Sequence, residues 1–323
     1  MKQGTKEYRS ANIKEMQGWP LDKKITHSLK RIKEFYEAMD GKVYIAFSGG
    51  KDSGVLKHLV HSLYPDIPTV FSNTTNELPE IIEHVKSTDD VIWLTPKMTF
   101  VDTIKKYGFP LVGKMVARKV YTLRHPTPNN ENTVRLYSTG INQNGEYHAN
   151  SKLSEKWKFL LDEPFEITNV CCDILKKEPM KRYETETGRV PFIGTQAIES
   201  ETRKKNWIDH GCNIIDSKKP SGRPLSIWSD KDIWEYTHRF EVPYSSAYAD
   251  KLDDDENVIV KGEVRTGCAY CGFGADQEKS DLVNLNRFER LKLRKPKQYE
   301  KMMNIKNNGI TFREALHKVG VRA

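Results

Sequence analysis

The sequence predicts an α/β fold: a doubly wound, mainly parallel sheet with helices on both faces. Three short apolar runs, 43–47, 69–71 and 91–94, read as buried strands, and segments with helical spacing follow each of them. This alternation is typical of a parallel sheet covered by crossover helices. A chain of 323 residues can bury the core of one large domain or two.

The N-terminal half supplies most of this pattern. Residues 1–22 show no clear periodicity, and we expect them to be irregular. Apolar residues at helical spacing predict a helix over about 24–39, which Gly41 ends. The elements expected after it are, in order, strand 43–47, helix 54–63, strand 69–71, a helix from Pro79 to about 86, strand 91–94 and a helix over 99–107.

The second half is less regular. Residues 125–150 are rich in Pro, Asn and Gly and predict an inserted loop, whereas Ser229 followed by Asp230 predicts a capped helix start. The other expected elements are a helix at 157–161, strands at 191–195 and 214–215, a basic helix after 203 and mostly helical chain beyond 281. We expect a nucleotide-binding α/β domain over 1–240, with the insertion at about 125–150. A smaller helical, cysteine-containing region is expected over 241–323.

The first strand runs directly into a glycine-rich loop, Ser48-Gly49-Gly50-Lys51-Asp52-Ser53. A strand, a glycine turn and a helix start aim backbone N–H groups at one point, where they can bind an anion. Gly49 and Gly50 permit close approach of a ligand, and Lys51 adds a positive charge. The spacing is not that of a Walker A loop. The loop resembles the PP-loop of the adenine-nucleotide α-hydrolase superfamily, although a plain tight turn would also satisfy the pattern.

Four of the five cysteines form two close pairs, Cys171-Cys172 and the C-x-x-C of Cys268 and Cys271. A C-x-x-C alone is compatible with redox, zinc and cluster sites. Adjacent thiolates chelate one small ion poorly, but they can reach different irons of a cubane, and four thiolates are the usual ligand set of a [4Fe–4S] cluster. We expect such a cluster, with zinc or no metal as the alternatives.

These motifs are similar to those of a known family. Residues 171–180 resemble the C-C-x-x-R-K-x-x-P-L motif of cluster-containing adenylylsulfate reductases, in the phosphoadenosine phosphosulfate (PAPS) reductase-like branch of the PP-loop superfamily. Lys176 matches the family lysine beside the cluster, and Leu175 replaces its arginine. Residues 194–203 resemble the family's G-x-x-x-x-E-S-x-x-R nucleotide segment, which assigns Gly194, Glu199, Ser200 and Arg203 to nucleotide binding.

One departure concerns the catalytic thiol. Thioredoxin-dependent reductases of this family carry a cysteine near the C-terminus, and this sequence has none after Cys271. We therefore expect reductase activity with thioredoxin to be absent or very low. Cys212 is the only spare thiol, either as a buried apolar residue or as a persulfide carrier.

A second group, the DndC-like sulfurtransferases of DNA phosphorothioation, fits better. Their S-D-T-x-x-E-like element is similar to residues 72–77, in which Asn73 replaces the Asp. This element assigns Asn73, Thr74 and Glu77 to the cofactor site, and it leaves Asp52 and Glu77 as candidates to hold Mg²⁺. Residues 278–280, Glu-Lys-Ser, match the group's acid-Lys-Ser segment.

The net charge is +8 and its excess is uneven. Eight basic residues against two acidic ones lie within 287–306, and 114–124 holds four basic residues and no acid. Such stretches suit nucleic acid or a polyphosphate ligand, although a solvated helix face is the alternative. The sequence contains no membrane-spanning apolar run and no signal-type segment, so we expect a cytoplasmic location and no membrane partner.

Together these features predict an ATP pyrophosphatase-type enzyme with an iron–sulfur cluster, which adenylates an acceptor and transfers sulfur to it. The expected ligands are ATP, or APS or PAPS, with Mg²⁺, and the expected partners are DNA or tRNA and a sulfur donor such as a cysteine desulfurase. The alternatives are a sulfonucleotide reductase and a non-catalytic nucleotide- or DNA-binding regulator. Phosphate contacts are assigned to Ser48, Gly49, Gly50, Lys51 and Ser53. Asp52 is also assigned to the cofactor site, and catalytic roles are assigned to Lys51, Asp52, Lys176 and Cys212.

Overall fold

A central sheet of six strands organises the molecule. The computed structural model describes residues 5–252, 258–278 and 285–323. The strand order is β3-β2-β1-β5-β7-β6, and all neighbours are parallel except β6 and β7. The strands are β1 (Val43–Phe47), β2 (Thr69–Ser72), β3 (Val91–Leu94), β5 (Val190–Ile193), β6 (Asn213–Ile214) and β7 (Ser221–Gly222). The predicted fold class is confirmed.

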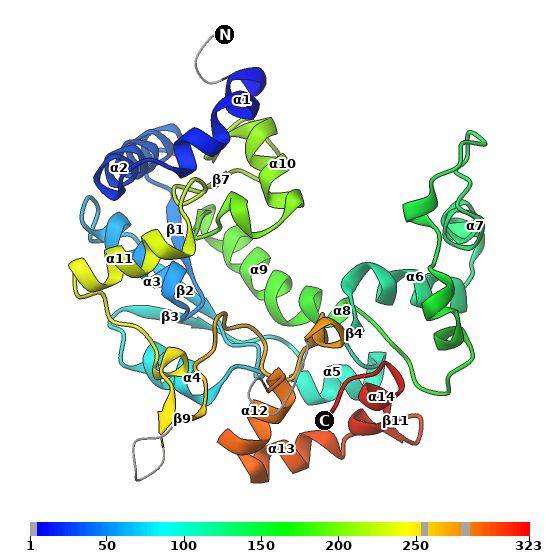
Figure 1. Ribbon diagram of the computed structural model, residues 1–323. Coiled ribbons are helices and arrows are strands. Elements are labelled where there is room, and N and C mark those ends of the chain that lie inside the picture. The colour runs from blue at the N-terminus through cyan, green and yellow to red at the C-terminus, as the bar shows by residue number, and fades with distance from the viewer. Residues whose placement is uncertain (1–4, 253–257, 279–284) are drawn as a thin grey trace.

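Helices cover both faces of this sheet (Figure 1). Val43 and Ile45 of β1 belong to a core that they share with α2 (Leu21–Ala38), α3 (Lys51–His61) and α11 (Asp230–Arg239). Tyr44 points the other way and packs with Tyr183 of α9 (Glu178–Thr187). Successive strand residues therefore feed opposite cores, which explains the continuous apolar run of β1.

The order of the strands reverses beside β1, at the carboxyl ends of the strands. From β1 the chain moves to β2 and β3 on one side, and it later returns to place β5 on the other side of β1. Ligands of open α/β sheets bind at such a reversal, outside the carboxyl ends of the strands. The loops after β1 and β5 flank this point.

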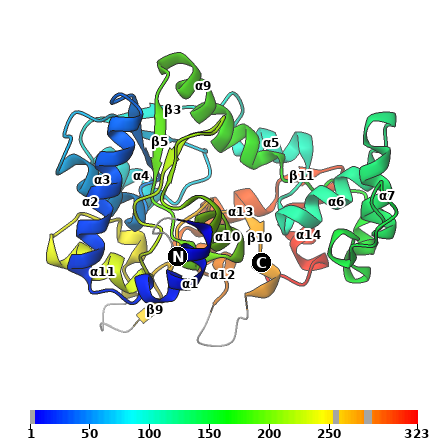
Figure 2. The same cartoon turned by 90° about the horizontal axis from the view of Figure 1, so that it is seen from above.

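The predicted loop at 125–150 is wrong in part, because it contains helical structure. α6 (Lys114–Arg124) and α7 (Glu131–Thr139) form an arm that stands off from the rest of the molecule (Figure 2). Short 3₁₀ turns complete the arm at Pro128–Asn130, Ala149–Ser151 and Glu155–Leu161. Buried Lys119 holds the arm together by donating to the carbonyls of Asn150 and Lys152 at 2.8 and 3.0 Å.

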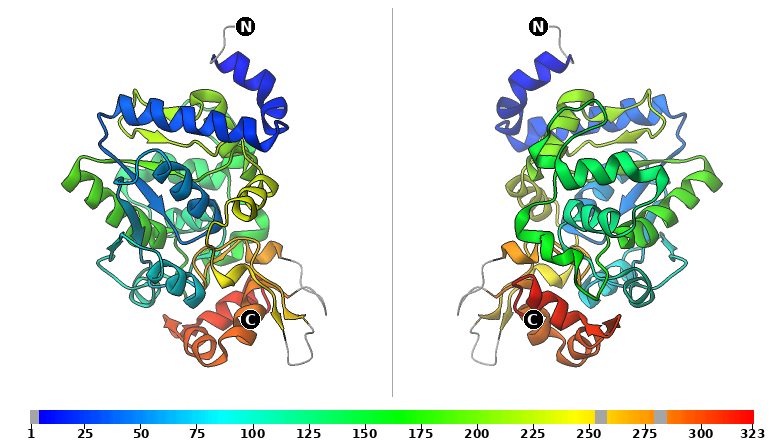
Figure 3. Two further views of the ribbon diagram at one scale, coloured as in Figure 1. Left: turned by 90° about the vertical axis from the view of Figure 1, so that its left-hand side faces the viewer. Right: turned by 90° about the vertical axis from the view of Figure 1, so that its right-hand side faces the viewer.

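The C-terminal part is helical, as expected, and lies at one end of the sheet domain (Figure 3). It contains α12 (Arg287–Arg294), α13 (Pro296–Met303), the hairpin of β11 (Lys306–Asn307) and β12 (Ile310–Thr311), and α14 (Phe312–Lys318). Phe312 stacks on Phe109 at 5.0 Å between ring centroids, so this part shares a core with earlier elements. A parallel pair of strands, β4 (Leu111–Val112) and β10 (Gly272–Phe273), adds a backbone link.

The N-terminal expectation is also wrong, because α1 (Lys6–Gln17) is a helix with Thr5 as its N-cap. Only Ile13 and Met16 of α1 are buried, which left too weak an apolar pattern to detect. The remaining elements are α4 (Pro79–Lys86), α5 (Phe100–Tyr107), α8 (Val170–Cys172), a π-helical turn (Asp173–Lys177), α10 (Glu201–His210), β8 (Lys251–Leu252), β9 (Val258–Val260) and 3₁₀ turns at Ala197–Glu199, Ser246–Tyr248 and Ala275–Gln277. No helix in the described ranges combines the length and apolarity needed to cross a membrane.

Candidate functional site

The glycine-rich loop after β1 folds as a compact turn into α3. The Ser48 amide donates to Ser53 Oγ at 3.1 Å, and Ser53 Oγ donates to the Gly50 carbonyl at 2.8 Å. Gly49 has φ +71°, and a Cβ there would lie 2.6 Å from a methyl of Val85, so this position requires glycine. The loop and the start of α3 have the form expected of an anion site.

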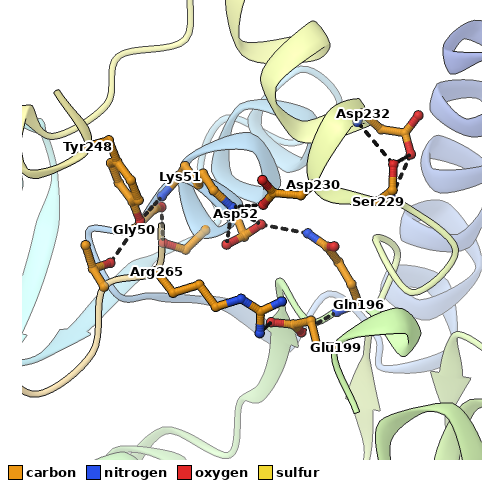
Figure 4. A network of polar contacts seen from close by, with 12 residues as sticks. Gly50, Lys51, Asp52, Gln196, Glu199, Ser229, Asp230, Asp232, Tyr248 and Arg265 are labelled. Carbon is orange, nitrogen blue, oxygen red and sulfur yellow. Dashed lines mark hydrogen bonds and ion pairs between the residues drawn. The ribbon is translucent and has the colours of Figure 1, made fainter. Parts of the chain in front are cut away.

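The ammonium group of Lys51 is paired with two carboxylates of the chain. Its Nζ lies 2.5 Å from Asp230 Oδ1 and 3.3 Å from Asp52 Oδ1 (Figure 4), and the residue is 3% exposed. Burial alone would lower the pKa of Lys51, but the two carboxylates raise it above its usual value. Asp52 also accepts from Gln196 Nε2 at 2.7 Å. The predicted phosphate contact of Lys51 therefore competes with an ion pair that the sequence did not reveal.

A segment from the C-terminal half covers the loop. The Lys51 amide donates to the hydroxyl of Tyr248 at 3.1 Å, and that hydroxyl lies 2.9 Å from Thr266 Oγ1. A Cβ at Gly50 would meet both side chains at 3.1 Å. Sequence reasoning missed Tyr248 and Thr266, since they lie in irregular chain about two hundred residues from their partner.

The segment after β5 lies against the same loop. A Cβ at Gly194 would lie 3.0 Å from the Asp52 carbonyl oxygen, so glycine allows the close approach. Glu199 is bound by Arg203 and, at 3.2 Å, by Arg265. Ser200 caps α10 by accepting from the Arg203 amide. The structure thus brings the predicted residues Gly194, Glu199 and Arg203 to the PP-loop and adds Arg265 to them.

The loop after β2 binds both cysteine-bearing segments. Asn76 is buried; its carbonyl accepts from Ala269 N at 2.6 Å and its Oδ1 accepts from Tyr270 N at 3.0 Å. Ser72 Oγ donates to the carbonyl of Leu175 at 3.0 Å. One loop therefore positions the C-x-x-C segment and the Cys171-Cys172 segment. Asn76 lies within the motif at 72–77, but the motif does not predict a role for it.

The four paired cysteines interact with one another. The Cys171 thiol donates to Cys172 and also feels the charges of Cys271 and Cys268. That hydrogen bond, with help from Lys114 and Lys176, lowers the pKa of the Cys172 thiol. Burial raises the pKa of Cys268 to about 11 and raises that of Cys271 as well. A cation at this centre would therefore favour thiolates that burial otherwise keeps protonated.

Lys176 and Glu77 are two of the charged side chains at this centre. Burial would lower the pKa of Lys176, but Cys268 and Glu77 raise it above its usual value. Burial raises the pKa of Glu77, against the influence of Lys176 and Thr74. Thr74 Oγ1 donates to Glu77 at 2.6 Å and lies 3.8 Å from Cys268 Sγ. Thr74, Glu77 and Lys176 therefore serve the cysteine centre rather than the PP-loop.

The four paired cysteines supply the donor type and number that a [4Fe–4S] cluster uses. Across the described ranges, no three His, Cys, Asp or Glu side chains lie close enough together to hold one metal ion. The mutual influence of four thiols, with Lys176 beside them, matches the ligand set of a [4Fe–4S] cluster. A cavity of 970 Å³ opens at Cys268 and Cys271.

Other predicted residues lie elsewhere. Of the two candidates for holding Mg²⁺, Asp52 lies at the PP-loop, where it accepts from Gln196, and Glu77 lies beside Thr74 and Lys176. Asn73 accepts from Thr75 N within its own turn. Cys212 is buried at the far end of α10, with Sγ 3.4 Å from Trp207 Nε1, so it meets neither centre. Lys279 and Ser280 of the acid-Lys-Ser segment lie outside the described residues.

The basic stretch 287–306 is partly neutralised within the chain. Arg287 pairs with Glu278, and Arg290 pairs with Glu263 at 2.7 Å. Arg294 donates to the Lys261 carbonyl at 3.0 Å. These arginines tie α12 to the irregular segments before it.

The chain is similar to several known proteins. Relatives include an uncharacterized protein of Methanocaldococcus jannaschii, 25% identical over 85% of this chain and 43% of its own length, and a second one from that organism, of which 48% is covered. The chain thus spans less than half the length of these two relatives. An adenosine 5'-phosphosulfate reductase of Bacillus cereus is 24% identical over 65% of this chain and 69% of its length.

Among solved structures, the PAPS reductase of Candida auris in complex with phosphate aligns with 78% of this chain and 97% of its own, at 14% identity and a TM-score of 0.40. The family model described as the phosphoadenosine phosphosulfate reductase domain matches residues 42–118 and 118–272. Those residues include the PP-loop, the segment after β5 and all four paired cysteines. The chain therefore belongs to the phosphoadenosine phosphosulfate reductase domain family.

Proposed function

We propose that this protein is an adenine-nucleotide-dependent sulfurtransferase with an iron–sulfur cluster on Cys171, Cys172, Cys268 and Cys271. One observation supports this most: the PP-loop and the loop that holds both cysteine segments follow the neighbouring strands β1 and β2. Neighbouring strands lie about 4.8 Å apart, so a nucleotide on one loop would face chemistry on the other.

The first step would be adenylation. An oxygen of the acceptor attacks the α-phosphorus of ATP, the α–β bond breaks and pyrophosphate leaves. The amide groups of the PP-loop and the Lys51 ammonium would stabilise charge on the phosphates, once Lys51 exchanges Asp230 for the nucleotide. Arg203 and Arg265 provide further cations at the same edge.

Sulfur at the oxidation level of sulfide would then attack the acceptor atom that carries the adenylated oxygen, and AMP would leave with that oxygen. If a persulfide delivers the sulfur, a thiol reductant must cleave the disulfide that results. The cluster would supply iron-bound sulfur or electron-transfer chemistry at the centre. Lys176 would stabilise negative charge on sulfur there, since its ammonium already interacts with Cys268.

Reduction of APS or PAPS is the second candidate, favoured by the names of the reductases to which the chain is similar. That reaction needs a thiol to attack the sulfate sulfur. Of the five cysteines in this sequence, four belong to the centre and Cys212 lies at the far end of α10. A reductase built on this site would need a thiol supplied from elsewhere.

Product analysis separates the two candidates. Protein purified without oxygen would receive ATP labelled at the α-phosphate, sulfide, and single-stranded DNA or tRNA, or else APS with thioredoxin. We expect acceptor-dependent AMP and pyrophosphate in the first mixture, little sulfite in the second, and loss of the products with Lys51→Ala. Rapid sulfite release without pyrophosphate formation would replace the proposal with the reductase.

A further inference from the structure

The exposed face of α6 and its C-cap carry a row of two cations and two aromatic side chains. Lys114, Arg118, Tyr121 and His125 recur at intervals of four, three and four residues, which places them on one face of the helix. All four are exposed. Within the described part of the chain, neither Lys114 nor Arg118 forms a side-chain hydrogen bond or ion pair.

The other two cations of α6 behave differently and show that the row is not a general surplus of charge. Lys119 is buried and donates to two carbonyls of the arm, and Arg124 pairs with Glu166 at 3.1 Å and donates to the Phe165 carbonyl. Lys119 and Arg124 therefore hold the arm together. Lys114 and Arg118, on the outer face, are left to meet a partner.

The aromatic members of the row form a flat platform. The rings of Tyr121 and His125 stack with centroids 4.3 Å apart and planes 26° apart, and His125 Nδ1 lies 2.8 Å from the Tyr121 carbonyl. Tyr121 is 42% exposed although it is aromatic. Glu166 is an acidic group at this end: Arg124 binds it, and its Oε1 lies 3.9 Å from His125 Nε2.

The start of the row is fixed beside the cysteine centre by backbone hydrogen bonds. β10 follows Cys271 directly, and its Gly272 pairs with Leu111 of β4. The Gly274 amide donates to Val112 at 2.6 Å, and α6 begins two residues later with Lys114. Lys114 is also within electrostatic range of Cys172. From there the row extends for about 16 Å along α6.

We propose that this face of α6 binds a single-stranded segment of nucleic acid and leads it to the cysteine centre. Two cations would contact phosphates, and the Tyr121–His125 platform would stack on a base, the combination by which proteins hold single strands. A row of about 16 Å matches roughly five stacked nucleotides. The bound strand would be the acceptor of the sulfurtransferase proposed above. Only the transfer of sulfur to the strand rests on that proposed function, whereas strand binding does not.

Binding can be measured without catalysis, by fluorescence anisotropy of labelled 12-nucleotide DNA and RNA strands, with no ATP present. We expect the single strand to bind better than the duplex. Arg118→Glu should weaken binding roughly tenfold or more, because it removes a charge-assisted contact and adds repulsion. It should also flatten the dependence of log K on log salt by about 0.7 per lost phosphate. Lys105→Glu on α5, an exposed lysine outside the row, makes the same charge change as a control.

The aromatic platform has its own test. Tyr121→Ala should weaken single-strand binding roughly 5- to 100-fold without changing the salt dependence, whereas Tyr121→Phe keeps the ring and should bind as the parent does. The proposal is overturned if no strand binds at 50 mM salt, if Lys105→Glu acts as strongly as Arg118→Glu, or if poly-glutamate binds as tightly as DNA or RNA. Pyrophosphate release that fails while strand binding persists would reject the proposed function and leave this interface standing.

Discussion

The two ends of the site hold their polar groups in opposite ways. At the PP-loop, the groups that would meet a phosphate already have partners within the chain, because Asp230 binds the Lys51 ammonium and Tyr248 accepts from its amide. At the cysteine end, the backbone is paired through Asn76 while the thiols influence one another's pKa. The nucleotide end must exchange partners to bind, whereas the segments that carry the cysteines are already held in place.

This difference sets how each end should respond to change. A ligand that displaces internal partners gains only the difference between the new contacts and the old ones. A set of ligands held by buried backbone hydrogen bonds loses its geometry when any holder is removed. Substitutions of the cysteines should therefore abolish cluster binding. Substitutions at the PP-loop should change the affinity for ATP by smaller amounts, and some of them should increase it.

The largest effect is expected from the cysteines themselves. Cys172→Ser should abolish binding of iron and acid-labile sulfide after anaerobic reconstitution, since it removes one of four thiolate ligands. The same loss is expected for Cys171, Cys268 and Cys271. Cys212→Ser is the matched control and should retain both, because Cys212 lies against Trp207 and His27. Zinc without sulfide in the parent protein would refute the cluster.

At the PP-loop, removing the cation and removing the carboxylate paired with it should change the affinity for ATP in opposite directions. Lys51→Ala removes a charge-assisted contact and should weaken ATP binding about ten- to hundredfold, as measured by calorimetry. Asp230→Asn removes the competing carboxylate and should strengthen binding. If both variants bind ATP as the parent does, the nucleotide does not bind at this loop.

The free energy of unfolding tests whether the loop after β2 holds the C-x-x-C segment in place. Asn76→Ala leaves the amide of Tyr270 without its buried acceptor and should reduce the free energy of unfolding by about 1–3 kcal/mol, as measured in urea. Asn73→Ala, in the same loop, removes only a contact within a turn and should cost less. Equal effects of the two would mean that Asn76 does not carry the link.

A contact could be predicted from the sequence only where its residues lie close together along the chain. The PP-loop is a local pattern, so strand, turn and helix were predicted together; only the helix begins earlier, at Lys51. The cysteine pairs were found from their spacing. The segments that hold them were not, because Asn76 meets Tyr270 at a separation of 194 residues. Local pattern carries no information about such pairs.

The errors have the same origin. Asp230 was identified only as a helix start, yet it lies on Lys51 at a separation of 179 residues. In the stretch 287–306, two arginines are neutralised by Glu263 and Glu278, which precede it in irregular chain. By contrast, half of the shorter basic stretch, on α6, has no such partner among the described residues. Charge counts along a sequence therefore cannot distinguish a paired arginine from an available one.

The smallest predicted effect concerns Tyr248, which closes the PP-loop. Tyr248→Phe keeps the ring but removes the hydroxyl that accepts from the Lys51 amide and contacts Thr266. The freed amide can then donate to a phosphate, so ATP should bind roughly 2- to 10-fold more tightly, a change that matches one neutral hydrogen bond. Thr266→Val removes only the outer contact of that hydroxyl and should change the affinity less. Weaker binding by Tyr248→Phe would show that the hydroxyl contacts the nucleotide directly, and the PP-loop end would then be preassembled as the cysteine end is.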